Sequence, residues 1–288
     1  MSKLLITGAT GHLGTATIRQ LLQKTSADKI VAFARDEHKA KDLIAKGVEV
    51  RYGNFDDPDS LEKAVQGIDK VLLISTVDIH RYQQHKNVVD AAKKAGVRRI
   101  AYTSGVLKDV HASPLKNHLK SHFQTEDYIK ESGLSYTIFG NTLYAEVIPM
   151  YIGDKVFETG IYLPAGNGKV PFALRREMGE ATANALLQDG SENKIYHLTG
   201  GKLYSYRDVA KVLTEISGKT VRYVEAKRTT FEEQLKQAKV SDMMISIVSG
   251  FNTDIKNQQY EIVSDDLENL LGRKPATLKE ALTEIYGL

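Results

Sequence analysis

The sequence contains no cysteine among its 288 residues. Disulfide bonds, thiolate metal sites and cysteine nucleophiles are therefore excluded by composition alone. A reducing compartment suits such a chain, because nothing in it depends on oxidation.

The sequence also lacks a strong excess of charge. Its 39 lysine and arginine residues stand against 36 aspartate and glutamate residues, for a net charge of +3, and the basic residues are spread along the chain. Since no massed basic run occurs, we expect no nucleic-acid partner. The first residues lead directly into Leu4–Ile6, an apolar segment too short for a signal peptide or a membrane span. We therefore expect a cytoplasmic protein without a membrane partner.

What the sequence does contain is a regular alternation of short apolar runs and longer helical patterns. Expected strands cover 3–7, 29–34, 48–52, 69–75, 98–103 and 135–139. Runs such as Val71–Ile74 are apolar without alternation, as in parallel strands that helices cover on both faces. Helix signals agree, since Asp36 can cap a helix that ends at Gly47. The pattern predicts an α/β fold with a Rossmann-type doubly wound parallel sheet over residues 1–142.

The pattern loosens after residue 142. Tyrosine, glycine and proline become frequent, and the turn residues at 163–168 suggest the wall of a cleft. Further expected elements are a helix at 175–188, a strand at 195–198, a helix at 205–217, a strand at 220–224 and several later helices. We assign 143–288 to a smaller C-terminal α/β part that is interleaved with the first domain.

Three glycines, Gly8, Gly11 and Gly14, lie between the first apolar strand and a helix. A glycine loop in this place turns tightly and lets backbone N–H groups approach a pyrophosphate, which side chains would block. The helix N-terminus adds orphan N–H donors and the positive end of its dipole. The spacing is G-x-x-G-x-x-G and not G-x-G-x-x-G, but its place between strand and helix predicts a dinucleotide site. The loop residues assigned to the cofactor are Gly8, Thr10, Gly11, His12, Leu13 and Gly14.

The end of the second expected strand distinguishes NAD from NADP. NAD enzymes of this fold usually carry an acidic residue there for the ribose hydroxyls, whereas an arginine accommodates a 2′-phosphate. Here Ala34 and Arg35 stand at that point. We interpret the carboxylate that follows, Asp36, as a helix N-cap. The sequence therefore predicts NADP(H), with NADPH preferred over NADH and Arg35 on the phosphate.

Several segments of the sequence form recognisable motifs. They are Leu5–Gly14, Ala34-Arg35, Gly53–Asp57, Ile100–Ser104, His122–Glu126, Asn141–Tyr144, Gly166–Lys169 and Val209–Gly218. Together they resemble the NmrA-like atypical short-chain dehydrogenases. Within that family the chain is most similar to bacterial NAD(P)H:quinone oxidoreductases and triphenylmethane dye reductases. The resemblance covers nearly the whole chain.

The resemblance implies an NADPH-dependent reductase with an NAD(P)-binding Rossmann domain, 1–142, and a substrate-binding part, 143–288. The cofactor would lie across the carboxyl ends of the strands, with the substrate between the two parts. The resemblance places Asn54 and Phe55 at the adenine, Ser75 and Thr76 near the nicotinamide-side ribose, Thr103 and Ser104 at the cofactor, and Asn141 and Tyr144 in the active-site cleft. The chain departs from the pattern at Gly140, where those reductases carry an arginine, and at Arg176–Glu177, where related proteins carry Arg-Asp. The first departure bears on the substrate and not on the cofactor.

Short-chain dehydrogenases commonly use a Tyr-x-x-x-Lys pair, in which the lysine and the cofactor ribose lower the pKa of the tyrosine. The spacing occurs at Tyr82/Lys86, Tyr151/Lys155 and Tyr223/Lys227. None of these pairs lies on the helix after the fifth strand, where the catalytic pair belongs, so we interpret all of them as coincidental. The chain is predicted to lack a tyrosine acid.

The helix after the fifth strand instead carries His118, His122 and Glu126, spaced one turn apart on one face. A catalytic zinc site needs convergent ligands, and no matching third-ligand motif accompanies them, so we expect no metal. We interpret His118 and Glu126 as a solvated helical stripe. The resemblance places His122 where related enzymes carry a lysine or histidine beside the nicotinamide, as a group that orients the substrate or relays a proton.

Asn141 stands at the end of the sixth expected strand. It is either an amide that faces the ligand crevice at the carboxyl ends of the strands or a turn residue, and the residue pattern leaves both interpretations open. The aromatic residues that follow line either a slot for a flat aromatic acceptor or an ordinary core. They are Tyr144, Tyr151, Phe157, Tyr162 and Phe172.

The leading hypothesis is an enzyme, an NADPH-dependent reductase that transfers hydride to a quinone-like or other flat aromatic acceptor. Such an acceptor needs little acid catalysis, because its reduced oxygens are weakly basic compared with an alkoxide. The alternative is an NAD(P)-binding sensor or regulator of the NmrA type, which binds the cofactor without turnover. Both suit a chain without a Tyr-Lys pair, whereas an epimerase or dehydratase requires that pair. The expected partner is a small molecule, and the sequence is compatible with an oligomer.

Overall fold

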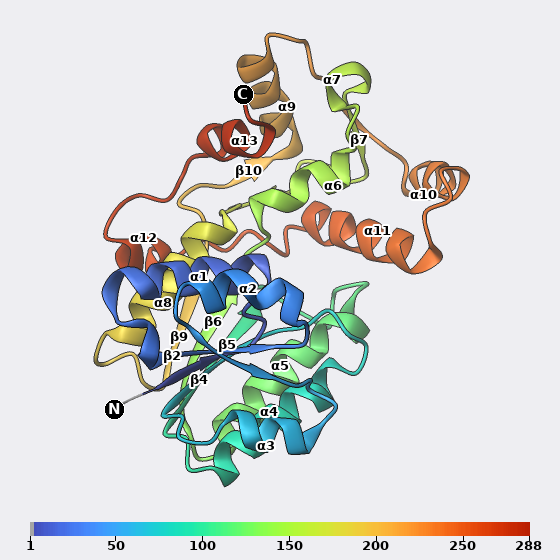
Figure 1. Ribbon diagram of the computed structural model, residues 1–288. Coiled ribbons are helices and arrows are strands. Elements are labelled where there is room, and N and C mark those ends of the chain that lie inside the picture. Colours follow the sequence, from blue (N-terminus) through green and yellow to red (C-terminus); the bar gives the residue numbers. More distant parts are fainter. Residues whose placement is uncertain (1–2) are drawn as a thin grey trace. The chain divides into compact units, whose positions relative to one another are not determined.

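The computed structural model describes residues 3–288. The chain forms two compact units, each assembled from separate segments. The first unit consists of the chain up to Gly105, Lys120–Asn141 and Arg175–Tyr196, and the second of Val106–Leu119, Thr142–Leu174 and His197–Leu288. Figure 1 shows the segments in colours that follow the sequence.

A seven-stranded sheet of the described residues forms the centre of the first unit (Figure 1). Its strands are β1 (Leu4–Ile6), β2 (Ile30–Ala34), β3 (Glu49–Tyr52), β4 (Lys70–Ile74), β5 (Arg99–Gly105), β6 (Ser135–Asn141) and β9 (Lys194–Leu198). Their order is β3-β2-β1-β4-β5-β6-β9, and the pairs from β3 to β6 are parallel. The Rossmann-type prediction is confirmed, and the strands expected within 1–142 end within two residues of their predicted limits. The order reverses between β1 and β4, where sheets of this kind bind ligands.

The strand β9 joins this sheet from the C-terminal half of the chain. The Asn193 N–H donates to the Tyr136 carbonyl oxygen at 2.6 Å, and the Thr142 N–H donates to the Leu198 carbonyl oxygen at 3.1 Å. The two hydrogen bonds advance in the same direction along both segments, so β9 runs parallel to β6. The strand expected at 195–198 is therefore present, but it forms an edge of the Rossmann sheet.

The helix α8 (Arg175–Leu187) packs on α1 (His12–Lys24). The approach is close because Gly179 has no side chain, and a Cβ there would lie 2.6 Å from the Ala16 Cβ. This packing and the pairing of β9 bring residues from beyond position 142 into the first unit.

Helices cover both faces of the sheet, as buried parallel strands require. α1, α2 (Glu37–Ala45) and α8 lie on one face, and α3 (Pro58–Ala64), α4 (Arg81–Lys94) and α5 (Lys116–Glu131) lie on the other (Figure 1). The core beneath α3, α4 and α5 contains Leu5, Val31, Leu61, Val71, Val88, Ile100 and Ile129. Burial of such apolar side chains stabilises the fold by about 1.5–3 kcal/mol each.

The predicted limits of α2 are confirmed. The Asp36 side chain accepts hydrogen bonds from the N–H groups of His38 and Lys39, at 2.8 Å from the His38 nitrogen. Beyond the helix, Gly47 has φ +77°, a left-handed conformation that glycine adopts without steric cost.

The glycine loop connects β1 to α1. Gly8 has φ +58°, and its carbonyl oxygen accepts a hydrogen bond from the Gly11 N–H at 3.0 Å, which closes the turn. A Cβ at Gly14 would lie 2.2 Å from the same carbonyl oxygen. The third glycine therefore lets α1 pack directly on the backbone of the loop.

The second unit contains two short strand pairs and several helices (Figure 1). β7 (Ile161–Leu163) runs parallel to β11 (Tyr223–Glu225), and β8 (Lys169–Val170) runs antiparallel to β10 (Tyr204–Ser205). Its helices are α6 (Ile148–Ile152), α7 (Val156–Thr159), α9 (Tyr206–Ser217), α10 (Arg228–Gln237), α11 (Asp242–Lys256), α12 (Asp266–Leu271) and α13 (Leu278–Tyr286), and 3₁₀ turns occur at Ala27–Lys29 in the first unit and Ala145–Val147 in the second. The helix expected at 205–217 is confirmed. α6 and α7 occupy a segment in which the sequence pattern indicated no regular structure.

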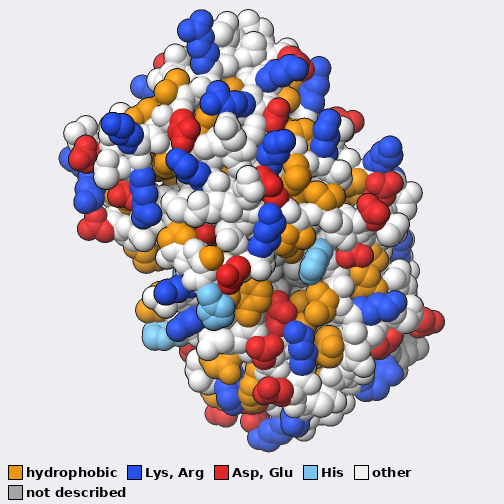
Figure 2. Space-filling model, turned by 180° about the vertical axis from the view of Figure 1, so that it is seen from behind, with side chains coloured by type: hydrophobic (Ala, Val, Ile, Leu, Met, Phe, Trp, Pro, Cys, Tyr) orange, Lys and Arg blue, Asp and Glu red, His pale blue; other side chains and the backbone are white. Residues whose placement is uncertain are grey.

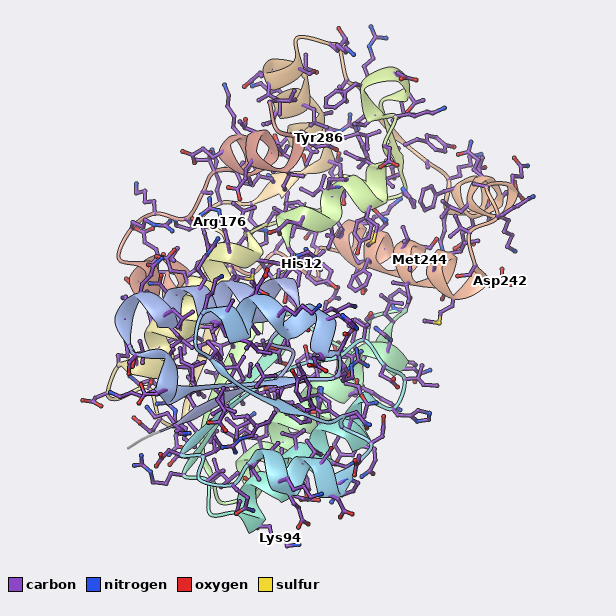
Figure 3. All side chains as sticks on the ribbon, in the orientation of Figure 1. His12, Lys94, Arg176, Asp242, Met244 and Tyr286 are labelled. Carbon is purple, nitrogen blue, oxygen red and sulfur yellow. The ribbon has the colours of Figure 1, made fainter. Side chains whose placement is uncertain are left out.

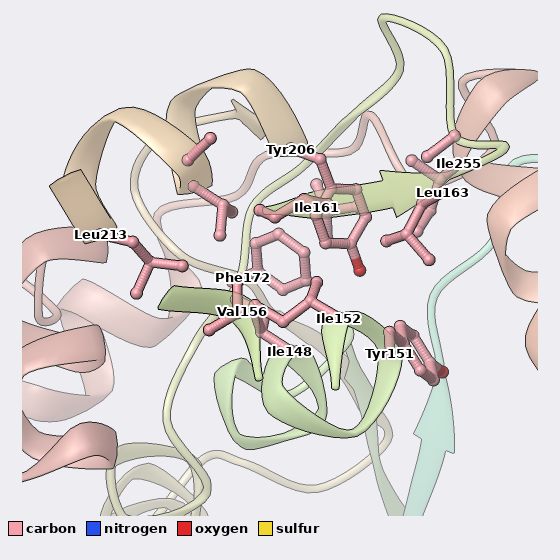
Figure 4. Close-up of a cluster of buried hydrophobic side chains, with 14 of the residues drawn as sticks. Ile148, Tyr151, Ile152, Val156, Ile161, Leu163, Phe172, Tyr206, Leu213 and Ile255 are labelled. Carbon is pink, nitrogen blue, oxygen red and sulfur yellow. The ribbon is translucent and has the colours of Figure 1, made fainter. Parts of the chain in front are cut away.

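The core of the second unit is apolar and contains several aromatic rings (Figure 4). Tyr151 and Phe172 are buried in it, and Phe157 and Tyr162 pack against it. The Phe172 ring meets Tyr206 nearly edge-on, with ring centroids 6.3 Å apart. These contacts favour the interpretation of these four aromatic residues as ordinary core.

The turn at 163–168 packs against α11. Five of its six residues are buried, and a Cβ at Gly168 would lie 1.7 Å from the Ile255 carbonyl oxygen. Glycine is therefore required at position 168 for close packing. That this turn forms part of the wall of a cleft remains a prediction.

No helix within residues 3–288 is long and apolar enough to cross a membrane. On the face shown in Figure 2, basic and acidic side chains are intermixed, with apolar side chains scattered between them. This mixture agrees with the small net charge of the chain.

Replacement of Gly14 by alanine is expected to destabilise the protein. The new Cβ would press on the Gly8 carbonyl oxygen, and overpacking of this kind costs about 1–3 kcal/mol. Urea unfolding followed by circular dichroism should show a lower midpoint for Gly14→Ala. Gly201→Ala is the matched control, because a Cβ there meets no atom within 4 Å. A wild-type midpoint for Gly14→Ala would refute the close contact.

Candidate active site

The carboxyl ends of β1, β4, β5 and β6 carry many of the predicted site residues at one edge of the sheet. The Ile74 N–H donates to Thr7 Oγ1 at 2.9 Å, and the Ser75 N–H donates to Thr103 Oγ1 at 2.9 Å. Asn141 is the last residue of β6 at the same edge. Threonine hydroxyl groups therefore hold the start of the loop after β4 against its neighbouring strands.

The N-terminus of α1 is open at this edge. Gly11 is the N-cap residue, no side chain caps the helix, and the first turn carries no acidic residue. Gly8, Gly11 and His12 are exposed, and His12 is labelled in Figure 3. Leu13 is buried and anchors the helix, while Thr10 is half-buried in the loop. The N–H groups of the first turn and the positive end of the dipole suit an anion such as a pyrophosphate.

The end of β2 carries an exposed cation, Arg35. The Asp36 carboxylate that follows is bound to the N–H groups of the first turn of α2, so it serves as a helix cap. A guanidinium at this point suits the 2′-phosphate of NADP, which it can bind through two hydrogen bonds.

The loop after β3 holds the two residues assigned to the adenine. Asn54 is exposed, and its Oδ1 accepts a hydrogen bond from the Asp56 N–H at 2.8 Å. The half-buried Phe55 ring lies parallel to Phe33, with centroids 6.0 Å apart, and edge-on to His85 at 6.5 Å. Other rings of the first unit therefore support Phe55, which gives it a fixed orientation for contact with a flat base.

His85 is a candidate that the sequence pattern did not indicate. It is fully buried on α4, its Nε2 accepts from the Thr76 N–H at 3.4 Å, and its Nδ1 lies 3.0 Å from Thr125 Oγ1. The Thr125 hydroxyl donates to the Ser121 carbonyl oxygen at 2.7 Å, so it accepts from the Nδ1–H of His85. Burial, followed by the charge of Arg81, lowers the pKa of His85 from 6.5 to about 3. The ring is therefore a neutral link between the loop after β4 and α5.

His122 lies on α5 against β5. Its Nδ1 is 2.9 Å from the Tyr102 hydroxyl, and its Nε2 contacts the Arg81 guanidinium. Arginine only donates hydrogen bonds, so Nε2 accepts, and the ring proton lies on Nδ1 and is donated to Tyr102. Burial raises the pKa of Tyr102 above its usual range. The structure places His122 in a polar cluster of the first unit, and its action on a substrate stays a prediction.

Glu126 does not belong to a solvated helical stripe, so that expectation is wrong. Its side chain is 13% exposed, and its Oε1 accepts a hydrogen bond from the Ser104 hydroxyl at 2.6 Å. His122 and Glu126 lie one turn apart on α5, and this spacing matches that of two residues on the same face of β5. These strand residues are Tyr102 and Ser104. His118 is half-buried in a segment of the second unit, and within residues 3–288 no group of three or more histidine, aspartate or glutamate side chains could hold a metal ion.

Asn141 and Tyr144 belong to different units. Asn141 is buried within β6, so its interpretation as a turn residue is wrong. Gly140, at which the chain departs from the family pattern, pairs with Ser104 of β5. Tyr144 lies in the second unit, where it forms a parallel β-bridge with Ala173. The assignment of Asn141 and Tyr144 to substrate contact stays a prediction.

The tyrosines of the Tyr-x-x-x-Lys spacings make structural contacts. Tyr82 meets Tyr128 edge-on, with ring centroids 6.4 Å apart. Tyr151 stacks on Phe251, and the Tyr223 hydroxyl donates to backbone carbonyl groups of the turn after β7. None of the three tyrosines lies on α5. Their coincidental spacing remains our interpretation.

The chain belongs to the NmrA-like family, whose model matches residues 1–285. It is 34% identical to quinone oxidoreductase 2 of Escherichia coli (strain K12) over 287 residues, which covers 99% of each chain. It is 28% identical to the NAD(P)H azoreductase of Xenophilus azovorans over 96% of each chain. The resemblance predicted from the sequence motifs is confirmed.

Solved structures agree with this membership. The crystal structure of an NADPH-dependent quinone oxidoreductase from Escherichia coli, complexed with NADPH, matches with a TM-score of 0.92 at 33% identity. That of Citrobacter sp. triphenylmethane reductase, complexed with NADP(H), matches with a TM-score of 0.89 at 33% identity. In both cases the match covers 98% of this chain and 99% of the other.

The neutral His85 is expected to make stability depend on pH. An unfolded histidine takes up a proton below about pH 6.5, whereas the native His85 ring does so only at about pH 3. The contribution of His85 to the free energy of unfolding is therefore complete above pH 6.5. It falls by about 1.4 kcal/mol per pH unit as the pH drops from 6.5 toward 3. In urea titrations, the unfolding free energy of His85→Gln should fall less steeply than that of the wild type below about pH 6.5.

Carboxylates titrate in both proteins, so their effect cancels in the difference. His111→Gln removes a histidine at an exposed position and serves as the matched control. Parallel slopes for wild type and His85→Gln would show that His85 is not a neutral buried group.

Proposed function

We propose that this chain is an NADPH-dependent reductase that transfers hydride to a quinone or another flat aromatic acceptor. The observation that carries the proposal is the uncapped N-terminus of α1, packed on the glycine loop where the strand order of the sheet reverses. Membership of the NmrA-like family supports it. So does the similarity to an NADPH-dependent quinone oxidoreductase and a triphenylmethane reductase.

The residues at this edge fit a dinucleotide. The N–H groups of His12, Leu13 and Gly14 would bind the pyrophosphate, because no side chain caps this helix end and its first turn carries no acidic residue. Arg35 would bind the 2′-phosphate, and the supported Phe55 ring would contact the adenine. Ser75 and Thr76 would lie near the nicotinamide-side ribose. When bound, NADPH supplies a hydride from its nicotinamide ring.

A quinone acceptor accounts for the lack of a Tyr-Lys pair on α5. The reduced oxygens of a quinone are weakly basic, so the reaction does not depend on a strong acid. We assign Asn141 and His122 to the orientation of the acceptor. For His122 this orientation would be indirect, through Tyr102 and Arg81, since both ring nitrogens contact these two protein groups.

Arg35→Ala is expected to weaken NADPH binding about ten- to a hundred-fold and to leave NADH binding nearly unchanged. Charge-assisted hydrogen bonds are worth about 1.5–3 kcal/mol, and only NADPH carries the 2′-phosphate. Isothermal titration calorimetry measures both affinities. Arg222→Ala removes an exposed arginine from the second unit and serves as the control. Equal losses for the two cofactors would refute the phosphate role of Arg35.

Purified protein is expected to oxidise NADPH when given 1,4-benzoquinone or a naphthoquinone, with no added metal or flavin. The loss of NADPH absorbance records the reaction. Asn141→Ala should lower turnover about tenfold, as for one lost hydrogen bond in the transition state. His122→Ala should also lower turnover, because Tyr102 and Arg81 lose the ring that both contact, and each variant should have a smaller effect on NADPH affinity. Tyr82→Phe and Tyr223→Phe are the controls and should keep most of the activity.

The same assay separates the enzyme from the alternative. If NADPH is bound at saturation but no quinone or dye is reduced above the uncatalysed rate, the reductase proposal fails. An NAD(P)-binding sensor of the NmrA type then accounts for the fold and the cofactor site. If the variants lose only cofactor affinity, the assignment of Asn141 and His122 to the acceptor is wrong.

A further inference from the structure

One glutamine on α4 contacts both loops to which the cofactor halves are assigned. Gln84 is 6% exposed. In the loop after β3, its Nε2 lies 3.0 Å from Asp56 Oδ2 and 3.3 Å from Asp56 Oδ1. In the loop after β4, its Oε1 accepts a hydrogen bond from the Thr76 hydroxyl at 3.1 Å. We call Asn54–Asp57 the adenine-side loop and Ser75–Asp78 the ribose-side loop.

The partners fix the orientation of the Gln84 amide. A carboxylate only accepts hydrogen bonds, so the NH2 group faces Asp56 and the carbonyl oxygen is left for the Thr76 hydroxyl. An ionised glutamate could not donate to Asp56, and an apolar side chain could bind neither loop. The position therefore requires a carboxamide.

Neighbouring residues of α4 hold the same two loops. Asn87 Nδ2 donates to the Phe55 carbonyl oxygen at 2.9 Å, on the adenine-side loop. His85 Nε2 accepts from the Thr76 N–H at 3.4 Å, on the ribose-side loop. One helix thus supports both loops, and Gln84 binds both with a single side chain.

We propose that Gln84 is a positioning residue that sets the spacing between the adenine-side loop and the ribose-side loop. The inference rests on the proposed function, because the two loops are assigned to the two halves of one dinucleotide. A ligand that spans both loops depends on their spacing, whereas a ligand that occupies the adenine-side loop alone does not. Loss of the bridge therefore weakens the whole cofactor more than its adenine half.

Gln84→Met tests this difference, because it keeps the length of the side chain and removes both hydrogen bonds. In calorimetry the affinity for NADPH should fall by up to about tenfold, because binding must then restore the loop spacing that the lost hydrogen bond to a charged group had fixed. The affinity for adenosine 2′,5′-bisphosphate, the adenine half, should change by less than about twofold. Gln23→Met, at an exposed position of α1, is the control. Equal losses for the two ligands, or no loss, would overturn the inference.

Gln84→Glu adds a second measurement, the pH dependence of NADPH affinity, which a merely structural role would not change. At about pH 8 its carboxylate faces Asp56, and repulsion should weaken NADPH binding. As the pH falls, the pair takes up one proton at a raised pKa, because two adjacent carboxylates resist joint ionisation. The proton restores a donor between the two carboxyl groups, and the other oxygen still accepts from Thr76. NADPH affinity should therefore rise toward the wild-type value between about pH 8 and about pH 5.5.

Other charged and titratable groups of the two loops and of the first turns of α4 are present in every variant. They are Asp56 in the adenine-side loop, Asp78 and His80 before α4, and Arg81 and His85 on α4. The wild-type pH profile therefore removes their effect, and Gln23→Glu controls for the added charge. If the wild type does not bind NADPH, the proposed function fails. If it binds, and Gln84→Glu either follows the wild-type profile or stays weak down to about pH 5.5, the inference alone fails.

Discussion

The contact between Gly14 and the Gly8 carbonyl oxygen is the constraint on which the site depends. Because the third glycine has no side chain, α1 begins directly against the loop that follows β1. Its N-terminus is thereby fixed at the edge where the strand order of the sheet reverses. A helix end attracts anions only at short range, so the direct contact would decide where the proposed pyrophosphate binds. The residues assigned to the other parts of a dinucleotide lie on strand ends and loops of the same sheet.

The site also depends on a polar face between β5 and the helices α4 and α5. Ser104 bonds to Glu126, and Tyr102 bonds to His122, whose other ring nitrogen contacts Arg81. Buried polar groups cost free energy unless they are hydrogen-bonded, and a satisfied network holds one arrangement of its members. In a chain without a Tyr-Lys pair on α5, this network supplies fixed polar groups beneath the loops assigned to the cofactor.

Local patterns were sufficient for much of the fold and for part of the site. Strands β1, β2 and β4 follow from apolar runs, because a parallel strand buried on both faces excludes polar residues from both. The glycine loop and the Asp36 cap follow from the conformational freedom of glycine and from the short reach of a capping side chain. Family membership follows from motifs that span nearly the whole chain. Each of these signals depends on residues that are neighbours in the sequence.

The sequence by itself thus determined the fold class, the family, the glycine loop between β1 and α1, and the position of Arg35 after β2. Only the tertiary structure decided that β9 pairs with β6, that Glu126 faces Ser104 and that Gln84 connects Asp56 to Thr76. The spacing of His122 and Glu126 was visible in the sequence, but one helical face can meet solvent, a metal or a strand. The physical reason is that such polar contacts join elements distant in the chain, and no local periodicity records which helical face packs on which strand.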